Sequence, residues 1–124
     1  MKKWSTDELR RIVDADDLKV LPLRADGITH RTPTWIWCVA VDGELLVRAY
    51  HGRGSRRYQA AATQKSGRII AAGTTREVVF DLVSEGPIGD AIDAAYRAKY
   101  ATSPYLKPMV GASARSATVR IAPR

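Results

Sequence analysis

The chain has 124 residues, of which 45% are hydrophobic, and carries a formal net charge of +7. This length predicts a single domain, residues 1–124, and the apolar fraction suffices for a packed core, which argues against a disordered chain. No apolar run approaches the ~20 residues of a membrane span, and the opening MKKWSTDELRR is too polar for a signal or transit peptide. A single cysteine, Cys38, allows no internal disulfide, so we expect a reduced, cytoplasmic protein.

The positive charge is concentrated in one segment. Of the 20 Lys and Arg residues, seven lie in residues 45–76, which contain no acid, and the other 13 balance the 13 Asp and Glu residues. The stretch 77–93 then holds five acids and no base. A local excess of this kind is what a specific anion site requires.

The first predicted element is a helix that begins near Ser5. Ser5 and Glu8 form a capping-box pattern, and Trp4 and Leu9 form a hydrophobic staple across the same start. The acidic run DADD at residues 14–17 is expected to end this helix.

Three strands are predicted next. The sequence LKVLPLR (18–24) indicates a short strand, in which Pro22 favours a sheet edge. TPTWIWCVAV (32–41) and ELLVRAY (44–50) are expected to pair through a two-residue Asp-Gly turn. Because the first arm of this hairpin is apolar on both faces, we expect a barrel wall covered on its outside by a helix or a partner subunit.

The middle of the chain predicts a helix and a second hairpin. RRYQAAATQ (56–64) is typical of a short helix, closed by the Ser-Gly pair at 66–67. RIIAA (68–72) and TREVVFDLV (75–83) are expected to pair through a turn at residues 73–74.

The last third predicts a long helix and a closing strand. Ser84 is the expected cap of the helix, with Pro87 in its first turn. Its apolar face is predicted to comprise Ile88, Ala91, Ile92, Ala95, Tyr96 and Tyr100. Residues 101–115 read as irregular, and SATVRIA (116–122) alternates as a strand. About six strands and three helices in this order predict a small antiparallel barrel of the α+β class.

Several catalytic motifs are missing. The sequence has no Walker loop, no GxGxxG and no GxSxG elbow. Two histidines, His30 and His51, with one cysteine do not make a zinc pattern. We therefore expect no metal and no nucleophilic catalysis.

The basic loop YHGRGSRRYQ (50–59) is the strongest candidate site. Its two glycines could turn backbone N–H groups inward, and Ser55 to Arg57 occupy a predicted helix N-terminus, a natural cradle for phosphate. Arg48 is close enough in sequence to reach the same anion. A solvated arginine-rich turn is the alternative. Nucleic acid is a weaker candidate partner, because few aromatic residues lie beside the loop.

Two tryptophans and the cysteine share one predicted strand. Trp35 and Trp37 are two positions apart and are expected on the same face, either in the core or with one stacked on a planar ligand. Cys38 is expected on the opposite face as an inert buried thiol. Tyr96 and Tyr100 are interpreted as helix-face core or interface residues.

Residues 31–61, RTPTWIWCVAVDGELLVRAYHGRGSRRYQAA, resemble the flavin-binding split barrels, namely the pyridoxamine-phosphate-oxidase-like proteins and the deazaflavin-dependent nitroreductases. The resemblance lies in the opening Arg-Thr-Pro-Thr-Trp at 31–35, the tight hairpin, Tyr50 at the end of the returning strand, and Ser-Arg-Arg at 55–57. With AIDAAYRAKY and the closing SARSATVRIAPR, the whole chain resembles a small bacterial family of unknown function in this superfamily.

The resemblance implies a six-stranded antiparallel split β-barrel with flanking helices that forms a homodimer and holds FMN or a deazaflavin between its subunits. Such a protein is an oxidoreductase in which the cofactor carries out the hydride chemistry while the protein binds and orients it. Ser55, Arg56 and Arg57 would hold the phosphate, with Arg53 or Arg48 assisting. The remaining implied site residues, which border the ring or end the strand beside it, are Thr32, Pro33, Thr34, Trp35 and Tyr50.

The sequence also departs from that pattern. Gly-Arg-Gly stands where flavin-phosphate binders often have bulkier residues, and Trp35 and Trp37 could themselves fill the ring pocket. Two alternatives therefore stay open: a non-enzymatic module of the same fold that binds a small anionic ligand, and a basic barrel that binds nucleic acid.

Overall fold

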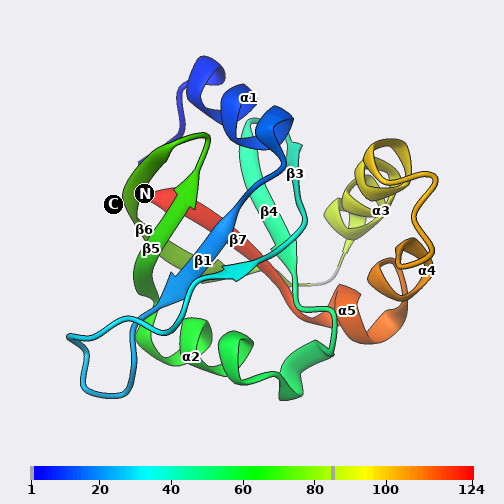
Figure 1. The fold of residues 1–124 in the computed structure, drawn as a ribbon. Helices are drawn as coiled ribbons and strands as arrows, with labels where there is room; N and C mark the ends of the chain where they lie inside the picture. Colours follow the sequence, from blue (N-terminus) through cyan, green and yellow to red (C-terminus); the bar gives the residue numbers. More distant parts are fainter. Residues whose placement is uncertain (1, 85) are drawn as a thin grey trace.

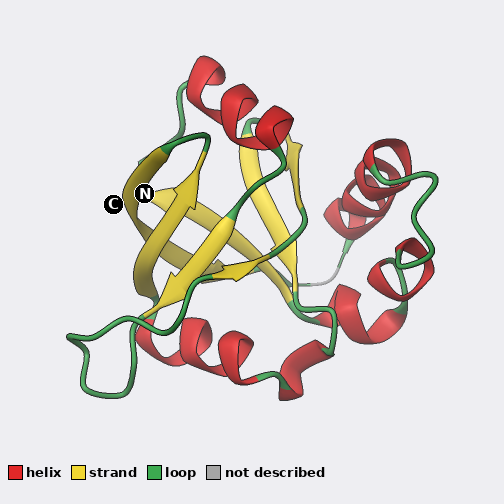
Figure 2. Ribbon diagram, in the orientation of Figure 1, coloured by secondary structure: helices red, strands yellow, loops and turns green. Residues whose placement is uncertain are grey.

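A curled antiparallel sheet forms the centre of the molecule in the computed structural model, which describes residues 2–84 and 86–124 (Figures 1 and 2). Across these residues the sheet has seven strands in the order β2-β1-β5-β6-β7-β4-β3. The strands are β1 (Lys19–Pro22), β2 (Thr34–Trp35), β3 (Cys38–Val41), β4 (Glu44–Arg48), β5 (Ser66–Ala71), β6 (Thr74–Leu82) and β7 (Thr118–Pro123). The expected α+β class and antiparallel pairing are confirmed.

The seventh strand arises from a break in the predicted strand 32–41. Thr34 and Trp35 pair with β1, whereas Cys38 onward pairs with β4 at the opposite edge of the sheet. At the break, the Ile36 N–H donates to the Leu18 carbonyl at 3.0 Å. The prediction of six strands is wrong for this reason: the chain crosses from one sheet edge to the other, and the sheet curls into a half-barrel.

The two predicted hairpins form, one of them displaced by a residue. The β3–β4 turn has positive φ at both Asp42 (53°) and Gly43 (77°), as a two-residue Asp-Gly turn requires. The β5–β6 turn comprises Ala72 and Gly73, with φ of 50° and 75°, because Thr74 already pairs in the ladder. The predicted turn at residues 73–74 is therefore wrong by one position.

Strand β1 lies inside the sheet, between β2 and β5, so the edge position predicted from Pro22 is wrong. Strand β2 is short and pairs only with Lys19 and Val20 of β1. Pro22 lies beyond the end of β2, so its missing N–H removes no hydrogen bond between the two strands. On the other side, Pro22 faces Gly67 of β5. A Cβ at Gly67 would lie 2.5 Å from the Leu21 carbonyl oxygen, so this close approach of the strands requires glycine.

Five α-helices and a 3₁₀ turn flank the sheet within the described residues. They are α1 (Thr6–Ala15), the 3₁₀ turn η1 (Gly52–Gly54), α2 (Arg56–Gln64), α3 (Pro87–Lys99), α4 (Leu106–Met109) and α5 (Ala112–Ser116). None of these helices is both long and apolar enough to span a bilayer.

The helix ends match the predictions in part. The Ser5 hydroxyl accepts the Glu8 N–H, which confirms the predicted cap of α1. Helix α2 ends at a left-handed Lys65, and the Ser-Gly pair predicted to close it begins β5 instead. Gly86, rather than Ser84, is the N-cap of α3. The segment 101–115, predicted to be irregular, contains the short helices α4 and α5 because Met109 and Ala114 find buried positions against α3 and the sheet.

Two cores lie on the two faces of the sheet. The first is inside the curl and receives Leu45 and Val47 of β4, together with Trp4, Leu9 and Ile12 from the α1 end. The second lies outside β3 and β4, where Leu46 meets the buried face of α3. The expected covering helix is therefore present over β3 and β4, whereas Thr34 and Trp35 lie outside it and the sheet forms a half-barrel. On α3, Ile92 and Tyr96 are buried as predicted, and so is Tyr100 at its C-cap, while Ala91 is exposed and Asp93 is buried.

Candidate functional site

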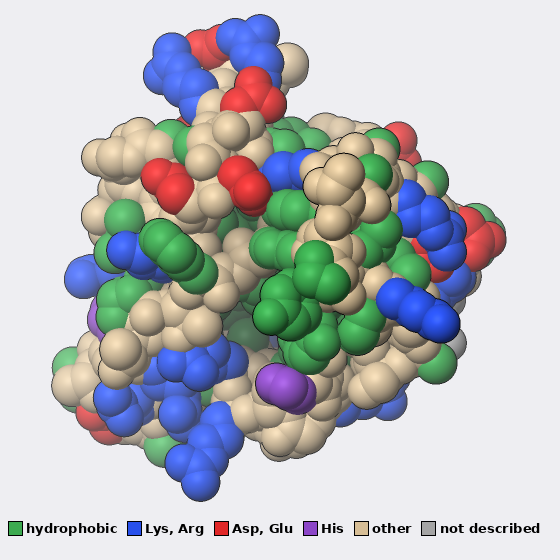
Figure 3. Space-filling model, turned by 45° about the vertical axis from the view of Figure 1, so that its right-hand side comes forward, with side chains coloured by type: hydrophobic (Ala, Val, Ile, Leu, Met, Phe, Trp, Pro, Cys, Tyr) green, Lys and Arg blue, Asp and Glu red, His purple; other side chains and the backbone are tan. Residues whose placement is uncertain are grey.

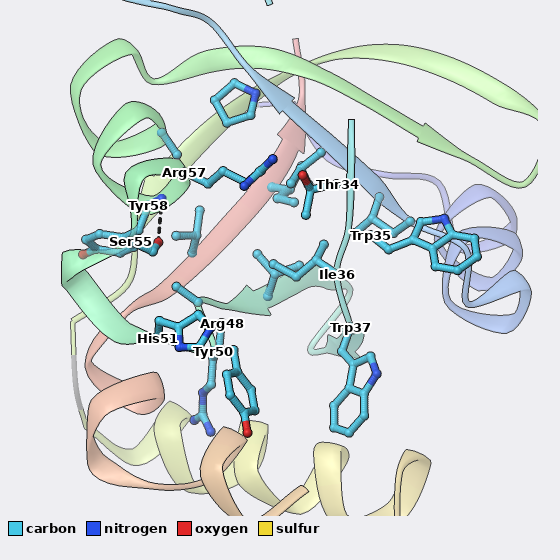
Figure 4. Close-up of a pocket in the computed structure, with 18 of the residues that line it drawn as sticks. Thr34, Trp35, Ile36, Trp37, Arg48, Tyr50, His51, Ser55, Arg57 and Tyr58 are labelled. Atoms are coloured by element: carbon cyan, nitrogen blue, oxygen red, sulfur yellow. Dashed lines mark hydrogen bonds between the residues drawn. The ribbon is translucent and has the colours of Figure 1, made fainter. Parts of the chain in front are cut away.

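A pocket of about 580 Å³ opens between α2, the loop after β4 and the β2–β3 connection (Figure 4). Its volume lies within the range of small-molecule sites, roughly 300–1,000 Å³. Basic and apolar side chains gather on the same face of the molecule (Figure 3). We define the rim of the pocket as Thr34, Trp35, Tyr50, His51, Ser55, Arg56 and Arg57.

The N-terminus of α2 forms one side of the rim. The Ser55 hydroxyl accepts the Tyr58 N–H at 3.1 Å, and the Ser55 N–H donates to the Gly52 carbonyl, so Ser55 caps the helix as predicted. The hydroxyl retains its own O–H for a ligand. In the described part of the chain the first-turn N–H groups of Arg56 and Arg57 meet no acceptor. These N–H groups are free to bind an anion at the positive end of the helix.

Arg56 and Arg57 add two exposed guanidinium groups to this helix end. The Arg57 side chain extends from α2 into the pocket toward Thr34 (Figure 4). Arg56 lies between the main pocket and a second, shallower one on the far side of α2. Ser55, Arg56 and Arg57, which the sequence predicted as a phosphate cradle, therefore all line the pocket.

In the folded structure, acidic side chains neutralise only some of the positive charges of residues 45–76. Three of the seven cations pair with acids, in the ion pairs Arg48–Asp93, Arg68–Glu77 and Arg76–Glu8. The other four have no acidic partner among the described residues, and these are Arg53, Arg56, Arg57 and Lys65. All four lie on α2, at its end or in the loop before it, so the unpaired positive charge is concentrated there.

Arg48 is not part of this charged rim. It is completely buried, and its guanidinium donates to Asp93, to the carbonyls of Gly89 and Met109 at 3.1 Å, and to the Thr118 hydroxyl at 3.2 Å. The side chain lies on the outer face of β4 and points toward α3 (Figure 4). The prediction that Arg48 assists an anion at the loop is wrong, because every guanidinium nitrogen is already bonded within the protein.

Arg53 and the loop glycines also have structural roles. The Arg53 Nε donates to the Ser116 carbonyl at 3.1 Å, which ties the loop to α5 and places Arg53 outside the pocket. Gly52 has φ of 77°, its N–H donates to Ala49, and a Cβ there would lie 2.3 Å from the Ser113 hydroxyl. Gly54 faces open space. The Gly52 N–H is therefore already bonded within the loop, and neither glycine lines the pocket.

The other predicted ring-binding residues separate into two groups. Thr34 and Trp35 line the rim, whereas Thr32 and Pro33 are exposed outside the pocket. Trp35 is 73% exposed, and the Lys19 ammonium lies 5.5 Å from its ring centre.

Trp37 does not share a face with Trp35, contrary to the prediction, because the strand breaks between them (Figure 4). Its ring stacks on Tyr100 at a centroid distance of 3.9 Å and an interplanar angle of 4°. Trp37 is therefore part of the second core as well as a wall of the pocket.

Two further aromatic side chains, His51 and Tyr105, line the pocket beside Tyr50 and were not assigned to a site from the sequence. Tyr50, predicted to end the strand beside the ring, makes edge contacts with His51 at 5.0 Å and with Tyr105 at 6.3 Å between ring centres. Tyr105 is 61% exposed and comes from the segment predicted to be irregular. No sequence pattern links Tyr105 to the loop, since the contact is made across more than fifty residues.

Burial shifts the pKa values of three groups on and beside β3, namely Cys38, Tyr96 and Tyr100. Burial raises the pKa of the Cys38 thiol to about 11, although Lys99 lies 3.7 Å from its sulfur and opposes the shift. The prediction that Cys38 is buried is confirmed. Burial likewise raises the pKa values of the Tyr96 and Tyr100 hydroxyls well above their ordinary value. Over the described residues, no three His, Cys, Asp or Glu side chains come together as a metal-binding group.

Comparison with known proteins identifies a family for the sequence and a solved structure with a similar fold. The profile of a family described as an uncharacterized protein conserved in bacteria, DUF2255, matches residues 8–121. Among solved structures, the crystal structure of the conserved hypothetical protein Rv2991 from Mycobacterium tuberculosis is similar, with a TM-score of 0.64 and 17% identity over 98% of this chain and 83% of that chain. At this identity the likeness shows a shared fold alone. No curated protein matches the sequence.

Proposed function

The chain belongs to the bacterial family DUF2255, and we propose that it is a split-barrel oxidoreductase that binds FMN or a deazaflavin at the rim of this pocket. One observation carries the proposal. The β2 residues Thr34 and Trp35 and the loop residues Ser55 to Arg57, distant in sequence and singled out separately as ring and phosphate contacts, line the same pocket.

The α2 end of the rim fits a phosphate group. Two free first-turn N–H groups, the Ser55 hydroxyl and the guanidinium groups of Arg56 and Arg57 are the donors that phosphate oxygens accept. The pocket does contain one acid, Asp16, but its carboxylate accepts the Tyr100 hydroxyl at 2.6 Å and lies 3.2 Å from the Lys99 ammonium. The rim is therefore positively charged where the phosphate would bind.

The opposite side of the rim fits a planar ring system. Trp35 and Tyr50 present exposed aromatic surface at the mouth, and the floor below them is apolar. A bound flavin or deazaflavin supplies hydride transfer, so the chain needs no acid, base or nucleophile of its own. The residues here bind the phosphate, orient the ring and keep water away from one of its faces.

The proposal includes a cytoplasmic homodimer. Trp35 and Tyr105 expose 73% and 61% of their surface beside the rim, and a partner subunit laid over them would also cover the bound ring. Aromatic side chains with this degree of exposure are enriched at protein interfaces. Sedimentation velocity should therefore show a dimer, and a monomer at all concentrations would contradict this part of the proposal.

A ligand titration tests the proposed function directly. Purified protein is titrated with FMN and, separately, with a deazaflavin coenzyme, while the absorbance spectrum of the ligand is followed. A ~1 μM site is nearly saturated at ~100 μM ligand, so a saturable spectral change is expected for one of the two. If neither ligand binds at that concentration, the proposal is wrong. Reoxidation of the reduced, bound ligand by a quinone, compared with the free ligand, then tests the oxidoreductase activity.

A further inference from the structure

The pocket continues below the rim into the curl of the sheet. This deeper part, here called the inner pocket, is reached from the rim between α2 and the β2–β3 connection. Side chains from β1, β4, β6, β7 and α2 surround it. The inner pocket comprises Leu18, Val20, Val47, Ala61, Phe80, Val119 and Ile121.

Every side chain of the inner pocket is a hydrocarbon. Val20, Val47 and Val119 retain 5–6% exposure, which the pocket supplies, although they belong to the first core. Branched aliphatic side chains on several strands of a curled sheet surround the space instead of facing each other as two flat walls. Such a space suits a flexible hydrocarbon chain better than a rigid ring, for which the aromatic rim is the better surface.

Apart from Asp16, which is paired with Lys99, the charged side chains at the mouth of this hydrocarbon space are arginines. The Arg57 side chain reaches from the rim into the pocket (Figure 4), and among the described residues no acid pairs with it. A guanidinium binds a carboxylate through two parallel hydrogen bonds. The pocket is thus complementary to a molecule with one anionic end and an aliphatic tail.

We propose that the inner pocket binds the aliphatic chain of a fatty-acid-like carboxylate whose head group is bound by Arg57. The inference goes beyond the proposed cofactor site. The first-turn N–H groups of α2, the Ser55 hydroxyl and Arg56 serve a phosphate at the rim, whereas the fatty acid extends inward from Arg57. Arg57 is shared with the proposed phosphate site, so the two ligands would compete for it although the rest of their contacts differ.

A chain-length series tests the proposal on the wild-type protein. Binding of hexanoate, octanoate and decanoate is measured by isothermal titration calorimetry below their micelle concentrations. Each methylene transferred from water to an apolar site contributes about 0.8 kcal/mol, so affinity should rise about fourfold per added carbon. An affinity that does not depend on chain length would overturn the proposal.

The head group is tested by comparing decanoate with decanol. Arg57→Ala should weaken decanoate about 10- to 100-fold, as expected for a charge-assisted hydrogen-bonded pair, and should leave decanol within about twofold. Equal losses for acid and alcohol would contradict the assigned role of Arg57.

The inner pocket itself is tested by filling it. Val119→Phe and, independently, Val20→Phe place a ring where the aliphatic chain would lie and should each weaken decanoate at least tenfold. Val79→Phe is the matched control, because Val79 of β6 lies outside the pocket and should bind decanoate as the wild type does. Thermal unfolding curves identify any variant that fails to fold, and the chain-length series does not depend on them. Unchanged decanoate binding in a folded pocket variant would overturn the proposal.

The outcomes separate this inference from the proposed function. Protein that binds decanoate but neither FMN nor a deazaflavin would contradict the cofactor proposal and support the fatty-acid site. Protein that binds a flavin but no carboxylate of any length would do the opposite.

Discussion

Arg48 and Arg57 belong to the same acid-free segment, yet their surroundings are opposite. Arg48 is fully buried, and its guanidinium donates to four groups of the protein, the carboxylate of Asp93 among them. Arg57 is exposed at the pocket rim and pairs with no acid in the described chain. One arginine is a structural element, and the other is free to bind a ligand.

The acids, rather than the arginines, create this difference. Helix α3 brings Asp93 against the outer face of β4, so Arg48 can be buried with a counter-ion. No described acid reaches the start of α2, so the charge of Arg57 remains in solvent. A buried cation needs a partner, whereas an exposed one does not. A cluster of arginines in a sequence therefore becomes interpretable only when the positions of the acids are known.

The largest expected effect comes from removing the counter-ion of Arg48. Asp93→Ala leaves the buried guanidinium without its carboxylate and also frees Arg115, which donates to Asp93 at 2.8 Å. We expect the free energy of unfolding in urea to fall by about 3–5 kcal/mol. Arg57→Ala is the control and should change it by less than about 0.5 kcal/mol. Similar losses in both variants would remove the distinction between the two arginines.

The glycines of the loop offer a matched pair. Gly52→Ala forces a side chain into a left-handed backbone and against Ser113, and it should lower the free energy of unfolding by about 2–3 kcal/mol. Gly54→Ala meets open space and should be close to neutral. If both variants were equally stable, the loop would not be fixed to α5 as described, and the position of the rim would be in question.

Cys38, like Arg48, is a buried titratable residue. Burial raises the pKa of its thiol from an ordinary 9.0 to about 11. Because the folded-state pKa is the higher one, the stabilisation is complete below pH 9 and is lost as the pH rises through 11. Between pH 8 and 10.5 the wild type should lose about 2 kcal/mol more unfolding free energy than Cys38→Ala, as measured in urea. Parallel pH profiles for the two proteins would contradict a buried neutral thiol.

The smallest effect concerns the caps of α1 and α2. Ser5→Ala and Ser55→Ala each remove a hydroxyl that accepts a first-turn N–H, and each should cost about 1 kcal/mol of unfolding free energy. Their ligand binding should differ, because Ser55 lies on the rim and Ser5 does not. Weaker FMN binding in both variants would show a general effect of stability instead of a contact.

Local patterns predicted the elements whose determinants are local. The cap at Ser5, the Asp-Gly turn and the start of α2 follow from side chains within a few residues, and the periodicity of α3 identified two of its four buried residues. The break at Ile36 could not be predicted this way. The apolar run continues through it, and the hydrogen bond at the break is made with Leu18, which lies just before β1 and far from Ile36 in the sequence.

In the candidate site, too, the residues with local sequence signals were predictable and those brought in from distant segments were not. Ser55, Arg56 and Arg57 follow from a helix start next to a basic loop. The alternation along β4 does place Arg48 on the face of Leu46, away from the interior residue Val47, and this signal could have excluded it from the site. By contrast, its partner Asp93 and the pocket-lining residue Tyr105 lie far along the chain, so only the folded structure identifies them.

The most direct test of the central claim, that the unpaired arginines bind a phosphate, compares FMN with riboflavin. Both ligands are titrated into the wild type and into the double variant Arg56→Ala/Arg57→Ala. Each charge-assisted hydrogen bond contributes about 1.5–3 kcal/mol, so the double variant should bind FMN at least about 100-fold more weakly and riboflavin within a few-fold of the wild type. Equal losses for FMN and riboflavin would show that the arginines do not contact the phosphate and would contradict the account.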